Sequence, residues 1–291
     1  MVRLFPVGLC GLLLTFTTAF PSAGGPRTVV SLAPSMTELV CDLGFAAHLV
    51  GRTSACDYPE AVLPVDVIGD FGRPNLEAIL RVKPDLVVGT AVENPAQLRI
   101  LEAAGVSVRT FPCRSWEDLM VAAQGISDAL GSPERGKAWI RKMDEARQAI
   151  GAEKGVTLHV ASRPTVFVEV WGDPLTSVGK DAFLTESIER AGGRSISAAI
   201  KGGYPHVSME WVVEQDPDMI LLLSMNQGMV SREQVARRPG WSGIRAIRNG
   251  HVVTDWNADL FLRPGPRLVE GMEILAKYLA TLGTEESTVV E

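Results

Sequence analysis

The sequence predicts an α/β protein of two Rossmann-like lobes with central parallel sheets, joined by one long helix, with a ligand cleft between the lobes. Three observations lead to this prediction. Short apolar runs alternate with short helical segments along most of the chain, which is the pattern of parallel sheets covered on both faces. One segment occurs twice, and a long amphipathic helix lies between its two copies.

The repeated segment is the strongest of these signals. Residues 75–88 read NLEAILRVKPDLVV, and residues 208–221 read SMEWVVEQDPDMIL. At one constant offset, the matched pairs are Glu77 with Glu210, Pro84 with Pro217 and Asp85 with Asp218. Phe71 and Tyr204 each stand six positions before the matched glutamate. One unit used twice predicts two similar lobes that hold paired aromatic and acidic side chains in equivalent positions.

The first lobe is predicted over residues 26–131. Strands are expected at 29–32, 48–53, 86–88 and 106–111, and helices at 36–43, 75–82 and 95–104. Gly44, Pro84 and Gly105 follow the three helices and end them, because glycine and proline interrupt helical structure. The alternation of strand and helix predicts a parallel sheet.

A joining helix is predicted over residues 132–156. Ser132 and Pro133 begin it, and Glu134 lies near the positive end of the helix dipole. Apolar residues then recur at helical spacing as far as Ile150. At 1.5 Å per residue the helix would be roughly 27 Å long, which is enough to cross between two lobes. We therefore expect only small lobe movements on ligand binding.

The second lobe is predicted over residues 157–291. Strands are expected at 164–170, 219–223 and 252–254. Helices are expected at 181–191, after Ser208, and at 266–282, and the polar tail from Gly283 is expected to fray.

Residues 1–25 have the layout of a secretory signal peptide. Arg3 precedes an apolar run over 4–20, and a small, turn-forming PSAGG segment follows it. A retained membrane anchor is the less favoured alternative, because the run is shorter than the roughly 20 residues of a spanning helix. We expect a soluble, exported mature chain.

Charge and cysteine content limit the possible functions. The chain carries 28 basic and 34 acidic residues, and loss of Arg3 changes its net charge from −6 to −7. This acidic balance argues against nucleic-acid binding, which requires a basic stripe. Cys41 lies on an apolar helical stretch and is interpreted as buried. Cys56 and Cys113 both follow predicted strands, so they could meet at one end of a sheet and form a disulfide in an oxidising compartment.

The sequence contains none of the common catalytic signatures. GxSxG, HExxH, CxxC, GxGxxG and GxxxxGK[ST] are all missing. The four histidines are scattered and lack the close pairing of a helical metal site, so no metal site is predicted. His206, between Tyr204 and the repeated helix, is the one histidine expected near a cleft.

Glu77 and Glu210 each fall in the first turn of a predicted helix. Stabilisation of the helix dipole by ~0.3–1 kcal/mol would explain one such acid. Two acids at matched positions on two lobes favour a second interpretation. They could pair with arginines of a partner that has matching two-part symmetry.

Several segments together resemble a known protein family. They are TVVSLAPSMTELVCDLG at 28–44, CDYP at 56–59, the NLE and SME segments with their KPDLVV and DPDMIL continuations, and RPGPR at 263–267. The chain is similar over 27–282 to the helical-backbone class of periplasmic substrate-binding proteins, which serve ABC importers of cobalamin, ferric siderophores and haem. Among these it looks most like the cobalamin-binding members.

The resemblance implies roles for individual residues. Glu77 and Glu210 match the lobe-tip glutamates that dock onto arginines of the membrane permease dimer. Phe71 and Tyr204 match aromatic positions that flank a corrin ring, where tryptophan is frequent. The further implied ligand contacts are Tyr58, Trp171, Asp255 and Trp256. Arg73 and Arg263, together with Arg52, Lys180 and Arg267, could line the same cleft and suit an anionic group of the ligand. Arg267 is also interpreted as structural, because it lies at the start of the last helix.

The sequence is therefore interpreted as a periplasmic, monomeric, non-enzymatic receptor. It would capture a corrinoid, with cobalamin as cargo rather than cofactor, and deliver it to an ABC permease. The aromatic residues on glycine-rich loops agree with this, because a large flat ring is gripped by aromatic faces. The alternatives are a ferric siderophore or haem receptor of the same class, and a secreted hydrolase with an unmarked triad.

Overall fold

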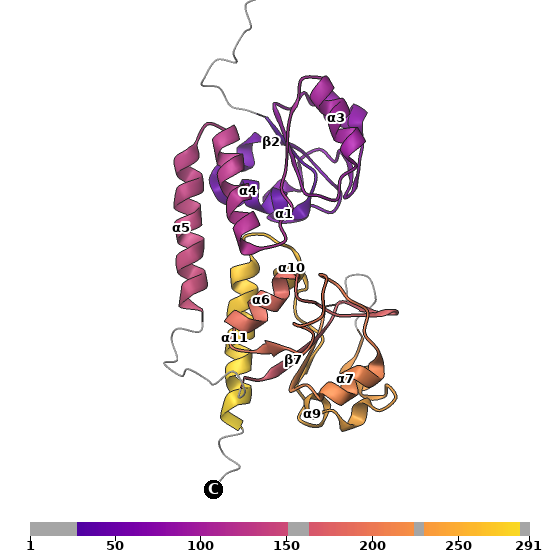
Figure 1. Ribbon diagram of the computed structural model, residues 1–291. Helices are drawn as coiled ribbons and strands as arrows, with labels where there is room; N and C mark the ends of the chain where they lie inside the picture. Colours follow the sequence, from indigo (N-terminus) through magenta and orange to yellow (C-terminus); the bar gives the residue numbers. More distant parts are fainter. Residues whose placement is uncertain (1–27, 151–162, 224–229, 286–291) are drawn as a thin grey trace, which may run out of the picture.

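The structure, a computed structural model, describes residues 28–150, 163–223 and 230–285. Two α/β lobes are stacked end to end, and helices α5 (Pro133–Ala149) and α11 (Leu268–Glu285) run along one side of the molecule (Figure 1). Each lobe has a parallel four-stranded sheet. The predicted fold class is confirmed.

The N-terminal lobe is built on the sheet order β2-β1-β5-β6. These strands span Val29–Ser31 (β1), Leu49–Arg52 (β2), Leu86–Gly89 (β5) and Ser107–Thr110 (β6). A small hairpin, β3 (Gly69–Asp70) and β4 (Arg73–Pro74), is added after β2. The α-helices are α1 (Pro34–Val40), α2 (Leu76–Arg81), α3 (Pro95–Ala103) and α4 (Trp116–Ala129), and short irregular helices cover Cys41–Phe45, Ala46–His48 and Glu60–Val62.

The C-terminal lobe has the sheet order β10-β7-β11-β12. These strands span Thr165–Glu169 (β7), Arg194–Ser195 (β10), Met219–Leu222 (β11) and Val252–Val253 (β12). A hairpin of β8 (Trp171–Gly172) and β9 (Leu175–Thr176) follows β7. The α-helices before α11 are α6 (Phe183–Arg190), α7 (Met209–Gln215), α8 (Arg232–Ala236), α9 (Arg245–Arg248) and α10 (Asp259–Leu262), and a 3₁₀ turn covers Trp241–Gly243.

The repeat extends into the hydrogen bonding of the two central strands. In the N-terminal lobe, the backbone N–H of Thr28 donates to Asp85 Oδ2 at 2.8 Å, and the N–H of Asp85 donates to Thr28 Oγ1 at 3.0 Å. Thr165 and Asp218 make the same two bonds in the C-terminal lobe, at 2.7 and 3.0 Å. The two copies of the unit therefore fold alike.

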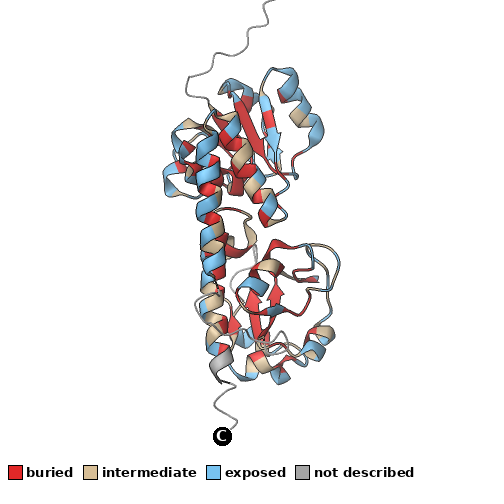
Figure 2. Ribbon diagram, turned by 60° about the vertical axis from the view of Figure 1, so that its left-hand side comes forward, coloured by how far each residue is buried: buried red, intermediate tan, exposed pale blue. Residues whose placement is uncertain are grey.

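Alternate residues of the central strands enter separate cores on the two faces of each sheet. Val29 and Val88 pack in one cluster, whereas Val30 and Val87 pack in another. Phe167 likewise lies on the opposite face from its strand neighbours. Figure 2 shows the buried strands at the centre of each lobe. Burial on both faces explains why these strands read as continuous apolar runs.

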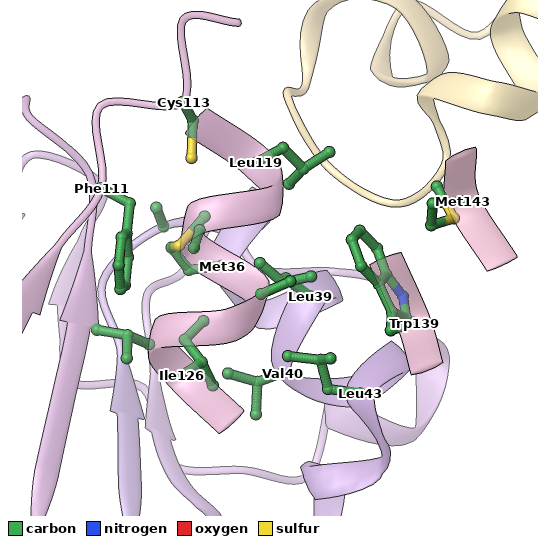
Figure 3. Close-up of a cluster of buried hydrophobic side chains, with 14 of the residues drawn as sticks. Met36, Leu39, Val40, Leu43, Phe111, Cys113, Leu119, Ile126, Trp139 and Met143 are labelled. Atoms are coloured by element: carbon green, nitrogen blue, oxygen red, sulfur yellow. The ribbon is translucent and has the colours of Figure 1, made fainter. Parts of the chain in front are cut away.

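The lobes share a packed junction. Phe183, Leu268 and Met272, which lie C-terminal to α5, pack in the same cluster as the α1 and α4 side chains. Trp139 and Met143 of α5 complete this cluster (Figure 3). Arg147 at the end of α5 pairs with Glu186 of α6. The joining helix therefore packs against both lobes along its described length, and its predicted end at 156 lies outside the described residues.

The predicted disulfide between Cys56 and Cys113 is wrong. Cys41, Cys56 and Cys113 are free thiols. Cys56 follows β2 and Cys113 follows β6, and these strands are the opposite edges of the sheet. Three strand spacings of ~4.8 Å separate the edges by roughly 14 Å, whereas the Cα atoms of a disulfide lie within about 7 Å of each other. Cys113 instead packs in the core near Phe111 (Figure 3).

Candidate ligand-binding cleft between the lobes

Three aromatic side chains are exposed in the described part of the chain. They are Tyr58, Phe71 and Tyr204, with 46%, 46% and 56% of their surface accessible. Aromatic side chains normally contribute their large apolar area to a core or an interface. All three are on loops, and all three were predicted as ligand contacts. Their exposure makes them the aromatic side chains of the described residues that a ligand can reach.

Phe71 lies at the tip of the β3–β4 hairpin. Asp70 pairs with Arg73 across the strands, so Phe71 and Gly72 form the two-residue turn, and Gly72 has a φ of 75°. Ser54 Oγ donates to Asp70 Oδ1 at 2.6 Å and fixes the hairpin to the loop after β2. Arg73 is exposed on the same hairpin. The structure therefore brings Phe71 and Arg73 together.

Tyr204 lies on a loop that is hydrogen-bonded along its length to the segment before α6. The N–H of Ser177 donates to Pro205 O at 3.0 Å, and the N–H of Gly179 donates to Gly203 O at 2.8 Å. The N–H of Gly202 donates to Asp181 Oδ2 at 3.0 Å. These bonds fix the backbone on both sides of Tyr204, so its ring is held at the loop surface.

A pocket of about 420 Å³ opens between the lobes at Tyr204. The N-terminal lobe contributes Pro112, Cys113 and Arg114, and the C-terminal lobe contributes residues 181–184, 203–204 and 261–268 in part. Partial burial in the pocket raises the pKa of the Tyr204 hydroxyl, although more than half of the side chain remains accessible. Burial, with the charges of Asp118 and Glu93, raises the pKa of Cys113 to about 12.

Tyr58 and Arg263 lie elsewhere, in an ion-pair network that joins the two lobes. Arg263 bonds to Glu38 at 3.2 Å, to Asp57 at 2.6 Å and to Asp259 at 2.9 Å. Arg267 holds the same Glu38 carboxylate through Nε at 2.9 Å and Nη2 at 2.6 Å. Its guanidinium also covers the Tyr58 ring, 3.9 Å from the centroid.

The expectation that Arg263 offers its charge to a ligand is therefore corrected. Three carboxylates of this chain occupy its guanidinium, and Glu38 is 3% exposed. Burial alone would lower the pKa of Arg263, but the hydrogen bond to Asp57 and the charge of Asp259 outweigh it and raise that pKa. The hydrogen bond from Arg263 in turn lowers the pKa of Asp57. Tyr58 lines a second pocket of about 330 Å³ with α1, α5 and the start of α11. The structural interpretation of Arg267 agrees with these contacts.

Strand order explains why the two regions are separate. Asp57 and Tyr58 follow edge strand β2, whereas residues 112–114 follow edge strand β6 and meet the loop after β10. The segment after β12 borders both regions, through Arg263 in the network and Leu262 in the pocket. Ligands of open parallel sheets bind beyond the carboxyl ends of the strands. Here these ends of the two sheets face each other, which defines an interlobe cleft with the ion-pair network at one end and the Tyr204 pocket at the other.

Among the remaining predicted ligand contacts, Trp171 and His206 lie close together, whereas Asp255 does not line either pocket. Trp171 is half-buried on β8, opposite Thr176. Thr176 also bridges to His206, with Oγ1 3.0 Å from Nδ1, so Trp171 and His206 belong to one small sheet. In contrast, Asp255 is exposed outside the two pockets described above.

Trp256 is not brought to the Tyr204 pocket. Its ring stacks on Phe261 at 5.5 Å and meets Tyr278 edge-on at 5.4 Å. It packs against the core of the C-terminal lobe. These contacts favour a packing role for Trp256.

Sequence reasoning missed two charged residues. Asp259 lies four positions before Arg263, a spacing that places both side chains on one helix face and could have revealed the pair. Arg114 lines the interlobe pocket. In the sequence, only the position of Arg114 shortly after a predicted strand indicates that it could lie at a cleft.

Two further properties bear on the type of site. Within residues 28–150, 163–223 and 230–285, no cluster of His, Cys, Asp and Glu could hold a metal ion. In these same ranges, every helix is too short or too polar to cross a membrane.

Comparison with known proteins identifies the family. The family model described as periplasmic binding protein matches residues 29–257. An ABC transporter substrate-binding lipoprotein of Bacillus subtilis, YvrC, is 32% identical over 87% of this chain and 80% of its own. The vitamin B12-binding protein of Vibrio vulnificus is 27% identical over 94% and 97%.

Solved structures show the same fold. The periplasmic haem-binding protein RhuT of a Roseiflexus species matches with a TM-score of 0.77 and 25% identity, over 89% of this chain and all of its own. The periplasmic vitamin B12-binding protein BtuF of Vibrio cholerae matches with a TM-score of 0.69 and 24% identity, over 88% and 98%. With its duplicated lobes and interlobe pocket, the chain belongs to the periplasmic binding protein family.

Proposed function

We propose that this protein is the exported receptor of an ABC importer and that its cargo is a corrinoid, most favourably cobalamin. One observation carries the proposal: Phe71 and Tyr204, at matched positions of the repeat, present exposed rings on loops held by hydrogen bonds. A large flat ring with polar edges is bound by such aromatic faces in a largely preformed site. No catalytic step is part of this function.

The relatives support a role in transport, and their names indicate two kinds of cargo. The Vibrio relatives are named for vitamin B12, whereas the RhuT structure is named for haem. A haem receptor is therefore the second candidate, and a ferric siderophore receptor belongs to the same class.

The chemistry of the pocket favours the corrinoid. Haem iron needs an axial donor such as Tyr, His or Cys. Tyr204 and Cys113 line the pocket, and burial raises the pKa of each, so a bound iron would have to displace the proton of the phenol or the thiol. His206 does not line the Tyr204 pocket, Tyr58 lies under the Arg267 guanidinium in the ion-pair network, and Phe71 has no donor atom. A cobalamin carries its own axial ligands and requires no donor from the protein.

Retention of a coloured ligand tests the proposal. Purified mature protein is incubated separately with cobalamin, haemin and a ferric siderophore, desalted, and examined by absorption spectroscopy. We expect one equivalent of cobalamin to remain bound and the other two to be lost. Retention of haemin or of the siderophore alone would assign the cargo to the alternative, and retention of none would contradict a receptor for flat chelates.

The paired aromatic residues provide a second test. Replacing Phe71 and Tyr204 together with Ala removes two stacking faces, each worth ~1–3 kcal/mol for a flat ring. Titration should show cobalamin affinity at least about tenfold weaker. Val121→Ala, which shortens an exposed apolar side chain on α4, is the control and should bind as the wild type does. Wild-type affinity of the double variant would exclude these rings from the site.

We further propose that Glu77 and Glu210 dock onto arginines of the permease. Both are exposed in the first turns of α2 and α7, behind the caps Asn75 and Ser208. Helix α2 packs on α3, and α3 and α7 both lie on the side away from α5 and α11 (Figure 1). Carboxylates at such positions can form charge-assisted pairs with guanidinium groups.

Reversing both charges separates docking from ligand binding. Glu77→Arg with Glu210→Arg should leave cobalamin affinity unchanged and abolish uptake by cells that carry the cognate importer. The matched control, Glu134→Arg with Glu233→Arg, changes the net charge equally in the first turns of α5 and α8. Equal uptake by both double variants would remove the docking role.

A further inference from the structure

One cation in the interlobe pocket has no partner of its own. Arg114 lines the pocket opposite Tyr204 and is exposed. Within the described ranges, no carboxylate forms an ion pair with its guanidinium, and the one hydrogen bond of this residue comes from its backbone N–H. Asp181 lines the same pocket and forms no ion pair with Arg114, and its Oδ2 accepts the N–H of Gly202. The charge of Arg114 is therefore available in this conformation.

The backbone holds Arg114 in position at some cost. Cys113 has a φ of 49°, a left-handed conformation that is strained for a residue with a side chain. The other two non-glycine residues with positive φ in the described ranges, Lys83 and Asp216, precede the matched prolines of the repeat. Cys113 has no such counterpart, so this strain is peculiar to the pocket wall.

Hydrogen bonds around Arg114 maintain this geometry. Its N–H donates to Asp118 Oδ2 at 2.8 Å. The N–H of Asp118 donates in turn to Ser115 Oγ at 3.1 Å, the N-cap bond of α4. These bonds fix the backbone at Arg114 and at the start of α4, which places the base of the side chain at the pocket wall before any ligand enters.

The other arginines near the cleft are bonded to groups of this chain or lie outside the Tyr204 pocket. Arg263 and Arg267 hold Glu38 in the ion-pair network. Arg52 donates to the carbonyls of Val62, Cys56 and Leu63. Arg73 is exposed on the β3–β4 hairpin and does not line the Tyr204 pocket. Arg114 is the arginine that lines the pocket beside an exposed aromatic ring.

We propose that Arg114 is a specificity-determining residue that pairs with an anionic group at the edge of the ligand, in cobalamin the phosphodiester of the nucleotide loop. This inference rests on the proposed function. Tyr204 supplies a flat face from one lobe, and Arg114 supplies a planar, fork-shaped donor from the other. A ligand that satisfies both has a polar, negatively charged group beside its ring.

Comparing cobalamin with cobinamide tests this assignment, because cobinamide has the corrin ring but lacks the nucleotide loop and its phosphodiester. Affinities are measured for wild type, Arg114→Gln and Arg114→Lys, with Arg99→Gln on the exposed face of α3 as the matched control. Loss of a charge-assisted bond corresponds to about tenfold or more in affinity.

We expect Arg114→Gln to weaken cobalamin binding at least about tenfold and to leave cobinamide binding unchanged. Arg114→Lys should fall between, since it keeps the charge and loses the fork. Unchanged cobinamide binding also shows that the variant is folded. Equal losses for both corrinoids would overturn the inference and point instead to an interlobe contact of Arg114, as would equal affinities of wild type and Arg114→Gln for cobalamin.

Failure of the proposed function gives a different result. If wild-type protein binds haemin and neither corrinoid, the cargo assignment is wrong. Haemin and its dimethyl ester then decide the role of Arg114, because only the free acid has ionised propionates. A loss in Arg114→Gln confined to the free acid would support the anion contact, and identical losses for acid and ester would overturn it.

Discussion

At the scale of single residues, Glu93 shows how the loop after β5 is held. It is 4% exposed, and its Oε1 accepts the N–H of Thr90 at 3.1 Å. Its Oε2 has no hydrogen-bond partner among the described residues. Burial raises the pKa of this carboxyl group, and the bonds from Thr90 offset the rise only in part. Gly89 leaves room for it, since a Cβ there would lie 2.9 Å from Oε1.

Glu93→Gln is expected to stabilise the protein at neutral pH. The folded pKa of Glu93 lies above its unfolded value of about 4.3, so ionisation costs stability as pH rises through the folded pKa. Gln keeps the acceptor for Thr90 and removes the buried charge, and the unpartnered amide N–H groups that replace Oε2 offset part of this gain, which leaves a net gain of about 1 kcal/mol. Thermal unfolding should show a higher Tm at pH 7, and the gain should disappear below about pH 4. A gain that is independent of pH would contradict this explanation.

At the scale of elements, a close backbone contact positions the Tyr204 loop. A Cβ on Gly179 would lie 2.3 Å from Gly202 O and 2.8 Å from Ile200 O. Both contacts are with backbone, which cannot rotate away as a flexible side chain can. Glycine at 179 is therefore required for the hydrogen-bonded approach of residues 177–181 to residues 200–205.

Gly179→Ala should displace the Tyr204 loop and weaken ligand binding by about tenfold or more, comparable to the loss of one stacking contact. Titration of the variant with cobalamin measures the effect. Gly243→Ala, where a Cβ would meet nothing within 4 Å, controls for the added methyl group. Equal affinities in the two variants would show that the backbone contact does not position Tyr204.

At the scale of the whole molecule, the lobes are joined by more than the linking helix. A shared hydrophobic cluster, the Arg147–Glu186 pair and the network around Glu38 all connect them. The lowered pKa of Asp57 means that its contribution is complete above about pH 4 and is lost only as pH falls through the folded pKa. These connections favour a stiff junction.

Scattering measures that stiffness. For a chain of roughly 265 residues, corresponding to residues 26–291, the expected radius of gyration is about 18 Å. Addition of ligand should change it only slightly in the wild type. Glu38→Gln leaves Arg263 and Arg267 without their shared buried carboxylate, so it should destabilise the protein by roughly 3–5 kcal/mol and increase the ligand-dependent change. A large compaction of the wild type would contradict a stiff junction.

Local sequence patterns determined the fold class. The repeat at 75–88 and 208–221 predicts two similar lobes, because an apolar strand preceded by a capped helix has few ways to fold. Loop composition around Phe71 and Tyr204 likewise indicates exposed rings, since a glycine-rich turn offers no core to bury them. Helix α4 received no prediction, although Ser115 caps it and its apolar residues recur at helical spacing.

Only the tertiary structure shows which side chains contact one another. The order of the strands separates Cys56 from Cys113, an arrangement that depends on crossovers and not on local patterns. Arg263 looks like a ligand contact until Glu38 and Asp57 from the other lobe join Asp259 around it, and Arg114 looks like a surface residue until the second lobe brings Tyr204 into the same pocket. Helices and strands can be predicted from the propensity and periodicity of neighbouring residues. Most charge pairs and the geometry of the cleft depend instead on contacts between residues far apart in the chain.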